Sequence, residues 1–214
     1  MRTAPQRPFG VAVPVRAFRL GNTRLAAGLD ETTRRHLAPL LAERVVLAAG
    51  GAPVVVVTDA PEVIDWATGL GVMVVPDPGS LDAAAAAGVD ALRRLGCRRA
   101  VVAHADLPHV VGYEPVVHDA GRAIAVFVPC HHDDGTPVLS VPTDVAFPFA
   151  YGPGSFRRHV VAARAAGLAT RVVRDPALAF DVDTVADLAE LERDDPTLLG
   201  ARTIAETTIE VTRP

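Results

Sequence analysis

Lysine is missing from the 214 residues altogether. The 21 residues counted as lysine plus arginine are all arginine. The P-loop motif GxxxxGK[ST] therefore cannot occur, and GxGxxG is absent too, which argues against a P-loop NTPase and a Rossmann dinucleotide site. Cysteine is scarce, and Cys97 and Cys130 lie far apart without CxxC spacing. Histidine shows neither HxxxH nor HExxH spacing. These patterns indicate neither a disulfide scaffold nor a zinc site.

Long apolar runs are missing as well. No stretch reaches the roughly 18 apolar residues of a membrane span, and the first residues lack a secretory pattern. Half of the residues are apolar, 21% are charged and the net charge is −4, which disfavours a nucleic-acid coat but permits a local basic pocket. We expect a cytoplasmic protein with one domain over residues 1–214, whose ends, 1–8 and 195–214, are peripheral.

Short β-branched runs alternate with alanine-rich helical stretches, a pattern typical of a mostly parallel sheet with helices on both faces. Continuous apolar runs such as "PVVVVT" favour strands that are buried on both faces. We predict an α/β fold with strands at Phe9–Val15, Pro53–Thr58, Val72–Val75, Arg99–Ala103 and Ala123–Val128. The helices expected between them are Glu31–Ala49, Glu62–Gly69 and Leu81–Leu95, the last with Ser80 as its N-cap.

The alternation of strand and helix patterns ends after Cys130, where turn residues are scattered among short strand-like pieces. This composition predicts a small mixed β arm or insertion. The elements expected to close the domain are helix Phe156–Ala166, strands near Thr170–Val173 and Ala177–Val182, helix Thr184–Arg193 and an edge strand at Thr207–Val211.

Three aspartates stand at the ends of predicted strands. Asp106 comes after "VVAHA", and Asp181 and Asp183 stand in "FDVDTVADL". Ligands in open α/β sheets bind beyond the carboxyl ends of strands, and Mg²⁺ prefers carboxylate oxygens completed by water and phosphate. We therefore predict that these acids share a Mg²⁺ site. The alternative is that Asp183 caps the helix beginning at Thr184 and that Asp106 caps a turn.

The segment "YGPGSFRRH" predicts a second binding feature. Gly152 and Gly154 permit close backbone approach, and Ser155 opens a helix whose first N–H groups suit a phosphate or carboxylate. Basic side chains in the first helical turn oppose the helix dipole, so their presence favours anion binding. They are Arg157, Arg158 and His159.

The stretch "VPVRAFRLGNTRLA" places Arg16, Arg19 and Arg24 just beyond the first strand. Arginine forms bidentate contacts with phosphate oxygens, so this loop is a candidate triphosphate site; the alternative is a solvated cluster of charge.

Another turn, "DPGSLD", runs into a helix with Asp82 in its first turn after Asp77 and Gly79. An acid there is ordinary compensation of the helix dipole, and it could also accept hydrogen bonds from a guanine edge. His131 and His132 are expected either at the surface or facing substrate.

Taken in order, six segments resemble the 2-phospho-L-lactate guanylyltransferase family, including its phosphoenolpyruvate-using branch, which acts in coenzyme F-420 biosynthesis. The resemblance covers nearly the whole chain. It rests on "VPVRAFRLGNTRLA", "PDPGSLDAAAAAG", "ADLP", "DGTPVL", "YGPGSFRRH" and "DVDTVADL".

The resemblance implies a single-domain, GT-A-type nucleotidyltransferase. Its activity would be Mg²⁺-dependent transfer of GMP from GTP to 2-phospholactate, phosphoenolpyruvate or 3-phosphoglycerate, with release of pyrophosphate. Matching positions make Asp106, Asp181 and Asp183 the metal ligands and Thr136, Gly152 and Ser155 the acceptor-binding residues, with Asp106 also catalytic alongside Arg16 and Arg24. The nucleotide-binding residues would be Arg16, Asn22, Arg24, Asp77, Gly79 and Asp82.

The chain also departs from the family's usual pattern. The departures are Arg16 and Asn22 where lysines are usual, Asp82 for asparagine, Cys130-His131 for Asp-Arg, and Pro137 where asparagine or a small residue is usual. A nucleotidyltransferase of the same fold with another nucleotide or acceptor, and a non-catalytic nucleotide-binding paralogue, are the alternatives. We expect no nucleic-acid or membrane partner, and a homodimer is possible.

Overall fold

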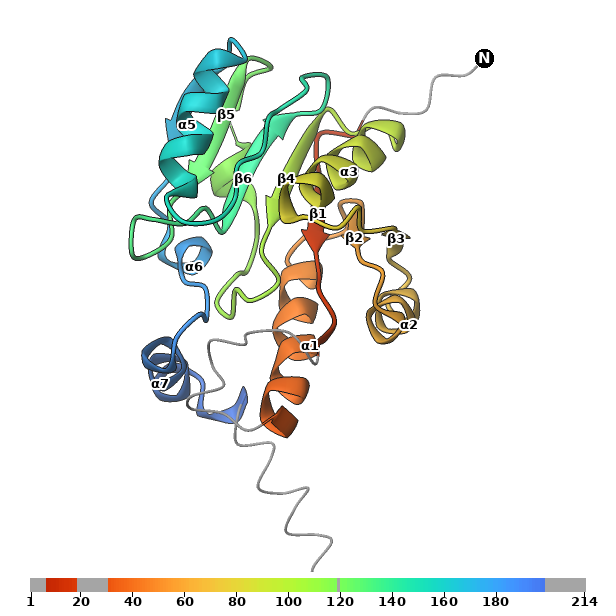
Figure 1. Ribbon diagram of the computed structural model, residues 1–214, viewed down its shortest axis with the longest axis vertical. Helices are drawn as coiled ribbons and strands as arrows, with labels where there is room; N and C mark the ends of the chain where they lie inside the picture. The colour runs from red at the N-terminus through yellow and green to blue at the C-terminus, as the bar shows by residue number, and fades with distance from the viewer. Residues whose placement is uncertain (1–6, 19–30, 119, 199–214) are drawn as a thin grey trace, which may run out of the picture.

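The computed structural model describes residues 7–18, 31–118 and 120–198, and its centre is a seven-stranded sheet in the order β3-β2-β1-β4-β6-β5-β7 (Figure 1). All neighbouring strands pair in parallel except β6, which runs antiparallel to both β4 and β5. The strands are β1 (Gly10–Pro14), β2 (Val54–Val57), β3 (Met73–Val75), β4 (Arg99–Ala103), β5 (Ile124–Val128), β6 (Val138–Pro142) and β7 (Ala169–Val172).

Helices cover both faces of this sheet (Figure 1). They are α1 (Glu31–Leu47), α2 (Pro61–Gly69), α3 (Leu81–Arg94), α4 (Glu114–Val117), α5 (Ser155–Ala165), α6 (Pro176–Ala179) and α7 (Val185–Asp194). Successive strand side chains face opposite sides. Val11 of β1 belongs to a cluster with Val45 of α1, whereas the adjacent Ala12 belongs to a cluster with Leu92 of α3.

Helix α3 approaches the sheet closely at Gly88. A Cβ atom added there would lie 2.6 Å from the Cβ of Ala12, so any larger residue would push the helix away from β1. The close approach brings the start of α3 near the carboxyl ends of β1 and β2. On the other face, α7 packs on α1 through Leu188 and Leu41.

The first five predicted strands and all three helices between them are confirmed, with ends that differ by a few residues. The strand near Thr170–Val173 and the helices Phe156–Ala166 and Thr184–Arg193 are confirmed as β7, α5 and α7. The mixed portion expected after Cys130 does not form an arm of its own. It supplies β6, which lies inside the main sheet between β4 and β5.

The predicted strand Ala177–Val182 is wrong. Pro176–Ala179 form the short helix α6, because the Asp175 side chain accepts hydrogen bonds from the backbone N–H groups of Ala177 and Leu178 at 2.9 and 3.1 Å. Proline at the first helical position adds a preset φ angle. This start signal outweighs the apolar alternation that favoured a strand.

The expected edge strand Thr207–Val211 lies outside the described residues, as does most of the expected peripheral segment 1–8. Within that segment, Arg7 is joined by backbone hydrogen bonds to Gly96 and Arg98. Among the helices of the described ranges, none combines the length and the apolar character that a membrane crossing requires.

Candidate functional site

A pocket of about 600 Å³ opens at the carboxyl ends of β1 and β4. Residues of α1 and the start of α3 line it together with five segments that are distant in sequence: the residues after β1, the residues after β4, the loop before β6, the loop before α5 and the segment before α7. Because the parallel strands end at one edge of the sheet, their following loops meet there. The pocket therefore stands where the strand pattern predicted a ligand site.

Predicted acceptor-side and metal-side residues meet in this pocket. Its lining includes Asp106, Asp181, Asp183, Arg16, Gly152 and Ser155. Thr136 is fully buried directly behind Ser155, with 3.3 Å between their hydroxyl oxygens.

The remaining predicted residues do not line it. Asp77, Gly79 and Asp82 lie outside its lining, while Asn22 and Arg24, with Arg19, lie outside the described residues. Asp77 accepts the Gly79 N–H at 2.9 Å, and Asp82 accepts the Tyr151 N–H at 2.6 Å. Asp82 thus ties the start of α3 to the loop before α5, and its proposed contact with guanine stays a prediction.

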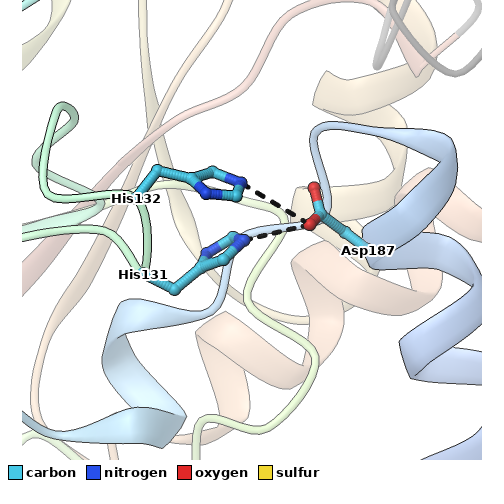
Figure 2. Close-up of side chains that lie close together, drawn as sticks. All are labelled: His131, His132 and Asp187. Carbon is cyan, nitrogen blue, oxygen red and sulfur yellow. Dashed lines mark hydrogen bonds and ion pairs between the residues drawn. The ribbon is translucent and has the colours of Figure 1, made fainter.

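Two histidines of the loop before β6 converge on α7 (Figure 2). The Nε2 atoms of His131 and His132 lie 3.0 and 3.9 Å from Oδ1 of Asp187, and the His132 residue also lines the pocket. From the sequence these histidines are expected at the surface or facing substrate, and Asp187 is not among the predicted site residues. Asp187 is 56 residues from His131 in the chain, so no local spacing indicated the contact.

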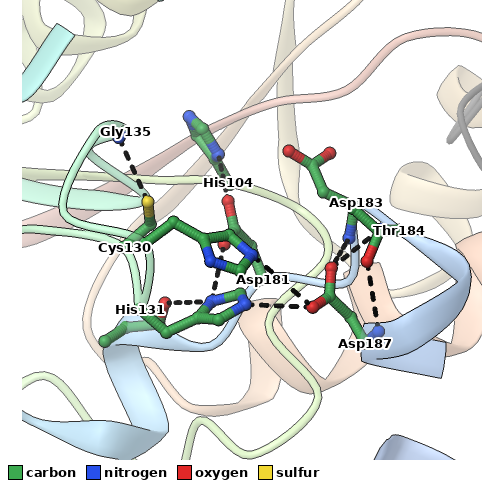
Figure 3. A network of polar contacts seen from close by, with 10 residues as sticks. His104, Cys130, His131, Gly135, Asp181, Asp183, Thr184 and Asp187 are labelled. Atoms are coloured by element: carbon green, nitrogen blue, oxygen red, sulfur yellow. Dashed lines mark hydrogen bonds and ion pairs between the residues drawn. The ribbon is translucent and has the colours of Figure 1, made fainter. Parts of the chain in front are cut away.

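The alternative that Asp183 caps the following helix is wrong. The N-cap is Thr184, whose side chain accepts the Asp187 N–H while the Asp187 carboxylate accepts the Thr184 N–H in a capping box. The Asp183 carboxylate is thereby left at the pocket wall (Figure 3).

Asp106, Asp181 and Asp183 form an acidic wall held together by the backbone. The Val182 N–H donates to the Asp106 carbonyl at 3.1 Å, which fixes the two acidic segments side by side. Three carboxyl groups on one pocket wall are the oxygen donor set that Mg²⁺ favours. The residues present therefore fit a divalent hard cation.

His104 sits beneath this wall, with its Nδ1 atom 3.9 Å from Oδ2 of Asp181 (Figure 3). Burial lowers the pKa of His104, and the charges of Asp181 and Asp183 act in the opposite direction. Burial likewise raises the pKa of Asp181, against the effect of His104. Each group is thus costly to charge alone, and a bound cation would stabilise the Asp181 carboxylate.

A directed chain of hydrogen bonds ends at Ser155. The Ala150 N–H donates to Nε2 of His159 at 2.9 Å, so the neutral ring carries its proton on Nδ1. Nδ1 then donates to the Thr136 hydroxyl oxygen at 3.0 Å. Thr136 can then donate its own proton to Ser155 at 3.3 Å, an order that leaves the O–H of Ser155 for the pocket that this residue lines. This order makes Ser155 a hydrogen-bond donor toward a ligand that accepts.

The basic residues in the first turn of α5 are predicted from the sequence to bind an anion. Two of them, Arg158 and His159, have other partners in the structure. Arg158 folds back and donates to the carbonyl oxygens of Ala150, Tyr151 and Pro153, so it holds the loop. His159 is fully buried, and burial lowers its pKa to about 4. The structural support for anion binding at this helix start thus comes from Ser155 and Gly152.

A family model described as guanylyl transferase CofC like matches residues 9–194. A phosphoenolpyruvate guanylyltransferase of Sphaerobacter thermophilus is 35% identical over 189 residues, covering 84% of this chain and 90% of its own. One of Rubrobacter xylanophilus is 36% identical over 187 residues, covering 84% and 91%.

Solved structures agree on the fold. A nucleotidyl transferase from Methanothermobacter thermautotroptrophicus superposes with a TM-score of 0.59 at 17% identity, over 87% of this chain and 97% of that one. A 4-diphosphocytidyl-2C-methyl-D-erythritol synthase from Anaerococcus prevotii gives 0.61 at 9% identity, over 88% and 96%. The expected nucleotidyltransferase fold is confirmed.

Proposed function

Because the chain belongs to the CofC-like guanylyl transferase family, we propose that it transfers GMP from GTP to the phosphate of phosphoenolpyruvate and releases pyrophosphate. The observation that carries the proposal is the convergence of Asp106, Asp181, Asp183, Gly152 and Ser155 on one pocket. Relatives named for the phosphoenolpyruvate reaction favour that acceptor over 2-phospholactate and 3-phosphoglycerate. A role in coenzyme F-420 biosynthesis follows from the resemblance and belongs to the same proposal.

In the reaction, an oxygen of the acceptor phosphate attacks the α-phosphorus of GTP. A new P–O–P bond forms, the bond between the α-phosphorus and the bridging oxygen breaks, and pyrophosphate leaves with that oxygen. Such a transfer needs two anions held in line and their charge neutralised, with little covalent chemistry from the protein.

The acceptor side is assigned to the α5 start. Ser155 donates its hydroxyl proton to an anionic group, and Thr136 and His159 orient that hydroxyl from behind. Gly152, at φ 103°, lets the backbone approach the acceptor without a side chain in the way. An acceptor that carries both a carboxylate and a phosphate offers the oxygens that this donor requires.

The metal side is assigned to the acidic wall. Asp106, Asp181 and Asp183 would hold Mg²⁺, which supplies neutralisation of the triphosphate charge and of the charge that develops at the α-phosphorus. Arg16 is exposed at the end of β1 and lines the same pocket, where its guanidinium can bind phosphate oxygens. Arg24 and Asn22 lie outside the described residues, and we assign them to the same triphosphate site from the sequence.

The test is release of pyrophosphate by the purified protein with Mg²⁺, each of GTP, CTP, ATP and UTP, and each of the three acids. Release that requires both GTP and phosphoenolpyruvate supports the proposal. Release with another nucleotide, or with GTP and a different acceptor, would assign the alternative nucleotidyltransferase. Binding of GTP without release under conditions where a relative turns over would indicate a non-catalytic paralogue.

A further inference from the structure

The histidine pair at the rim of the pocket has surroundings that the transfer of GMP does not explain. Nδ1 of His131 lies 3.4 Å from the Ala179 carbonyl oxygen and 3.6 Å from Oδ1 of Asp181. Its other nitrogen, Nε2, lies 3.0 Å from Oδ1 of Asp187. Both nitrogens of one ring therefore face oxygen acceptors. A neutral ring can satisfy only one of these sides, which leaves a lone pair against a carboxylate on the other.

Asp187 turns one of its two carboxylate oxygens toward His131 and His132. Its Oδ2 accepts the backbone N–H groups of Asp183 and Thr184 at 3.1 and 2.7 Å, so Oδ1 alone is turned to the histidines. The side chain is only 5% exposed, and the capping box fixes its orientation. The carboxylate is thus pre-positioned by contacts that do not depend on the histidines.

His132 completes the arrangement from the same loop. Its Nε2 lies 3.9 Å from the same Oδ1, and the two imidazole rings stand 3.8 Å apart between centroids (Figure 2). The three candidate ligand atoms lie within 4.8 Å of one another. Two imidazolium ions would repel each other at this separation, whereas two neutral rings around a shared cation would not.

We propose that His131, His132 and Asp187 bind a Zn²⁺ ion at the rim of the pocket, separate from the acidic wall. Two imidazole nitrogens and one carboxylate oxygen are a zinc donor set that leaves a fourth position for water. Around a tetrahedral Zn²⁺ the ligand atoms stand about 3.4 Å apart. The separations of 3.0 and 3.9 Å from Oδ1 lie on either side of that value.

The ion would use contacts already present as its outer shell. A ligating histidine commonly donates its other ring N–H to a carbonyl or carboxylate, and His131 Nδ1 faces both kinds of group. The site joins the loop that leads to Gly135 and Thr136 with the start of α7, so zinc would brace the acceptor side of the pocket. Local motifs miss it because the two histidines are adjacent and the third ligand lies 56 residues away.

The experiment is a zinc titration of the chelator-treated protein, with any purification tag removed and with excess Mg²⁺ present to occupy the acidic wall. We expect one Zn²⁺ per chain, the visible bands of tetrahedral Co²⁺ on substitution, and a rise in melting temperature with zinc. His131→Asn and His132→Asn should each weaken zinc binding about tenfold to 100-fold, since even outer-shell changes have that effect. Asp187→Asn, which keeps an oxygen for the cap, should also weaken it.

His118→Asn is the matched control, because His118 is an exposed histidine at the end of α4 that is not one of the three clustered ligands, so the change should leave the affinity unchanged. Equal zinc affinity in the natural protein and in the His131→Asn/His132→Asn double variant would overturn the proposal. So would zinc binding that Asp106→Asn abolishes and the double variant preserves, because the ion would then sit on the acidic wall. None of these measurements of zinc binding uses turnover, so the zinc site can fail while the proposed transfer of GMP holds, and the reverse.

Discussion

Thr136→Val is the most informative single change, because it removes the middle hydroxyl of the chain that orients Ser155. Valine keeps the shape of threonine in a fully buried place. The change leaves the His159 Nδ1–H without its acceptor, since Nε2 is already engaged by Ala150. An unsatisfied buried donor costs about 1–3 kcal/mol. At about 2–4 °C per kcal/mol for a chain of this size, the melting temperature should fall clearly.

The same change should weaken acceptor binding. Without the Thr136 hydroxyl, Ser155 loses the group that orients its own hydroxyl from behind, and one oriented contact to the acceptor anion is lost. A loss of about 1.4 kcal/mol corresponds to tenfold in the KM for the acceptor. The dissociation constant for GTP should stay unchanged, because the triphosphate is assigned to other residues. Steady-state kinetics with varied acceptor, and thermal melts with and without GTP, measure both effects.

Thr136→Ser is the control, since it keeps the hydroxyl and loses a methyl group. It should preserve the acceptor KM and lose only about 0.8 kcal/mol of stability. Thr136→Val and Ser155→Ala should be non-additive in acceptor KM, because both break the same chain. Additive effects, or an unchanged KM in Thr136→Val, would refute the reasoning that the chain orients Ser155.

Two other predictions concern pH and the metal ligands. Burial lowers the pKa of His159 from 6.5 to about 4, so its neutral form stabilises the fold above pH 6.5 and this contribution, about 3 kcal/mol, is lost as pH falls toward 4. Urea unfolding across that range should show a smaller acid loss in His159→Gln; parallel curves would contradict the assignment. Asp106→Asn should lower turnover by about 10²–10³-fold while far-UV circular dichroism stays unchanged. Turnover close to that of the natural protein would remove Asp106 from the metal site.

The sequence was informative about the strands and the edge where ligands bind. Runs such as Val54–Val57 must be buried on both faces, and that requirement is visible in their composition alone. The same reasoning predicted Asp106 beyond the end of β4, and in the structure Asp106 lines the pocket there.

The segment around Pro176 shows where local patterns fail. Apolar alternation over Ala177–Val182 favoured a strand, but the Asp175 cap and the proline at the first position started a helix instead. The alternation of apolar residues predicts a strand in this segment, whereas the capping aspartate and the proline predict the start of a helix. The start signal prevails because it satisfies backbone N–H groups directly.

The contacts that organise the site could not be predicted, because their partners are far apart in the chain. Thr136 and His159 are 23 residues apart, and His131 and Asp187 are 56 apart. Only the packing of β6, α5 and α7 around the pocket brings these pairs together. The basic first turn of α5 was misjudged for the same reason, since neither the burial of His159 nor the loop carbonyls around Arg158 follow from composition.

In the proposed reaction, this pocket joins GMP to the phosphate of phosphoenolpyruvate. Phosphorus-31 magnetic resonance of a reaction with GTP, Mg²⁺ and phosphoenolpyruvate observes that bond directly. The account predicts that the α-phosphorus of GTP and the phosphorus of the acceptor become coupled in a new P–O–P linkage, with one pyrophosphate formed for each product. Formation of GMP and pyrophosphate without that coupling, or unchanged substrates where a relative reacts, would contradict it.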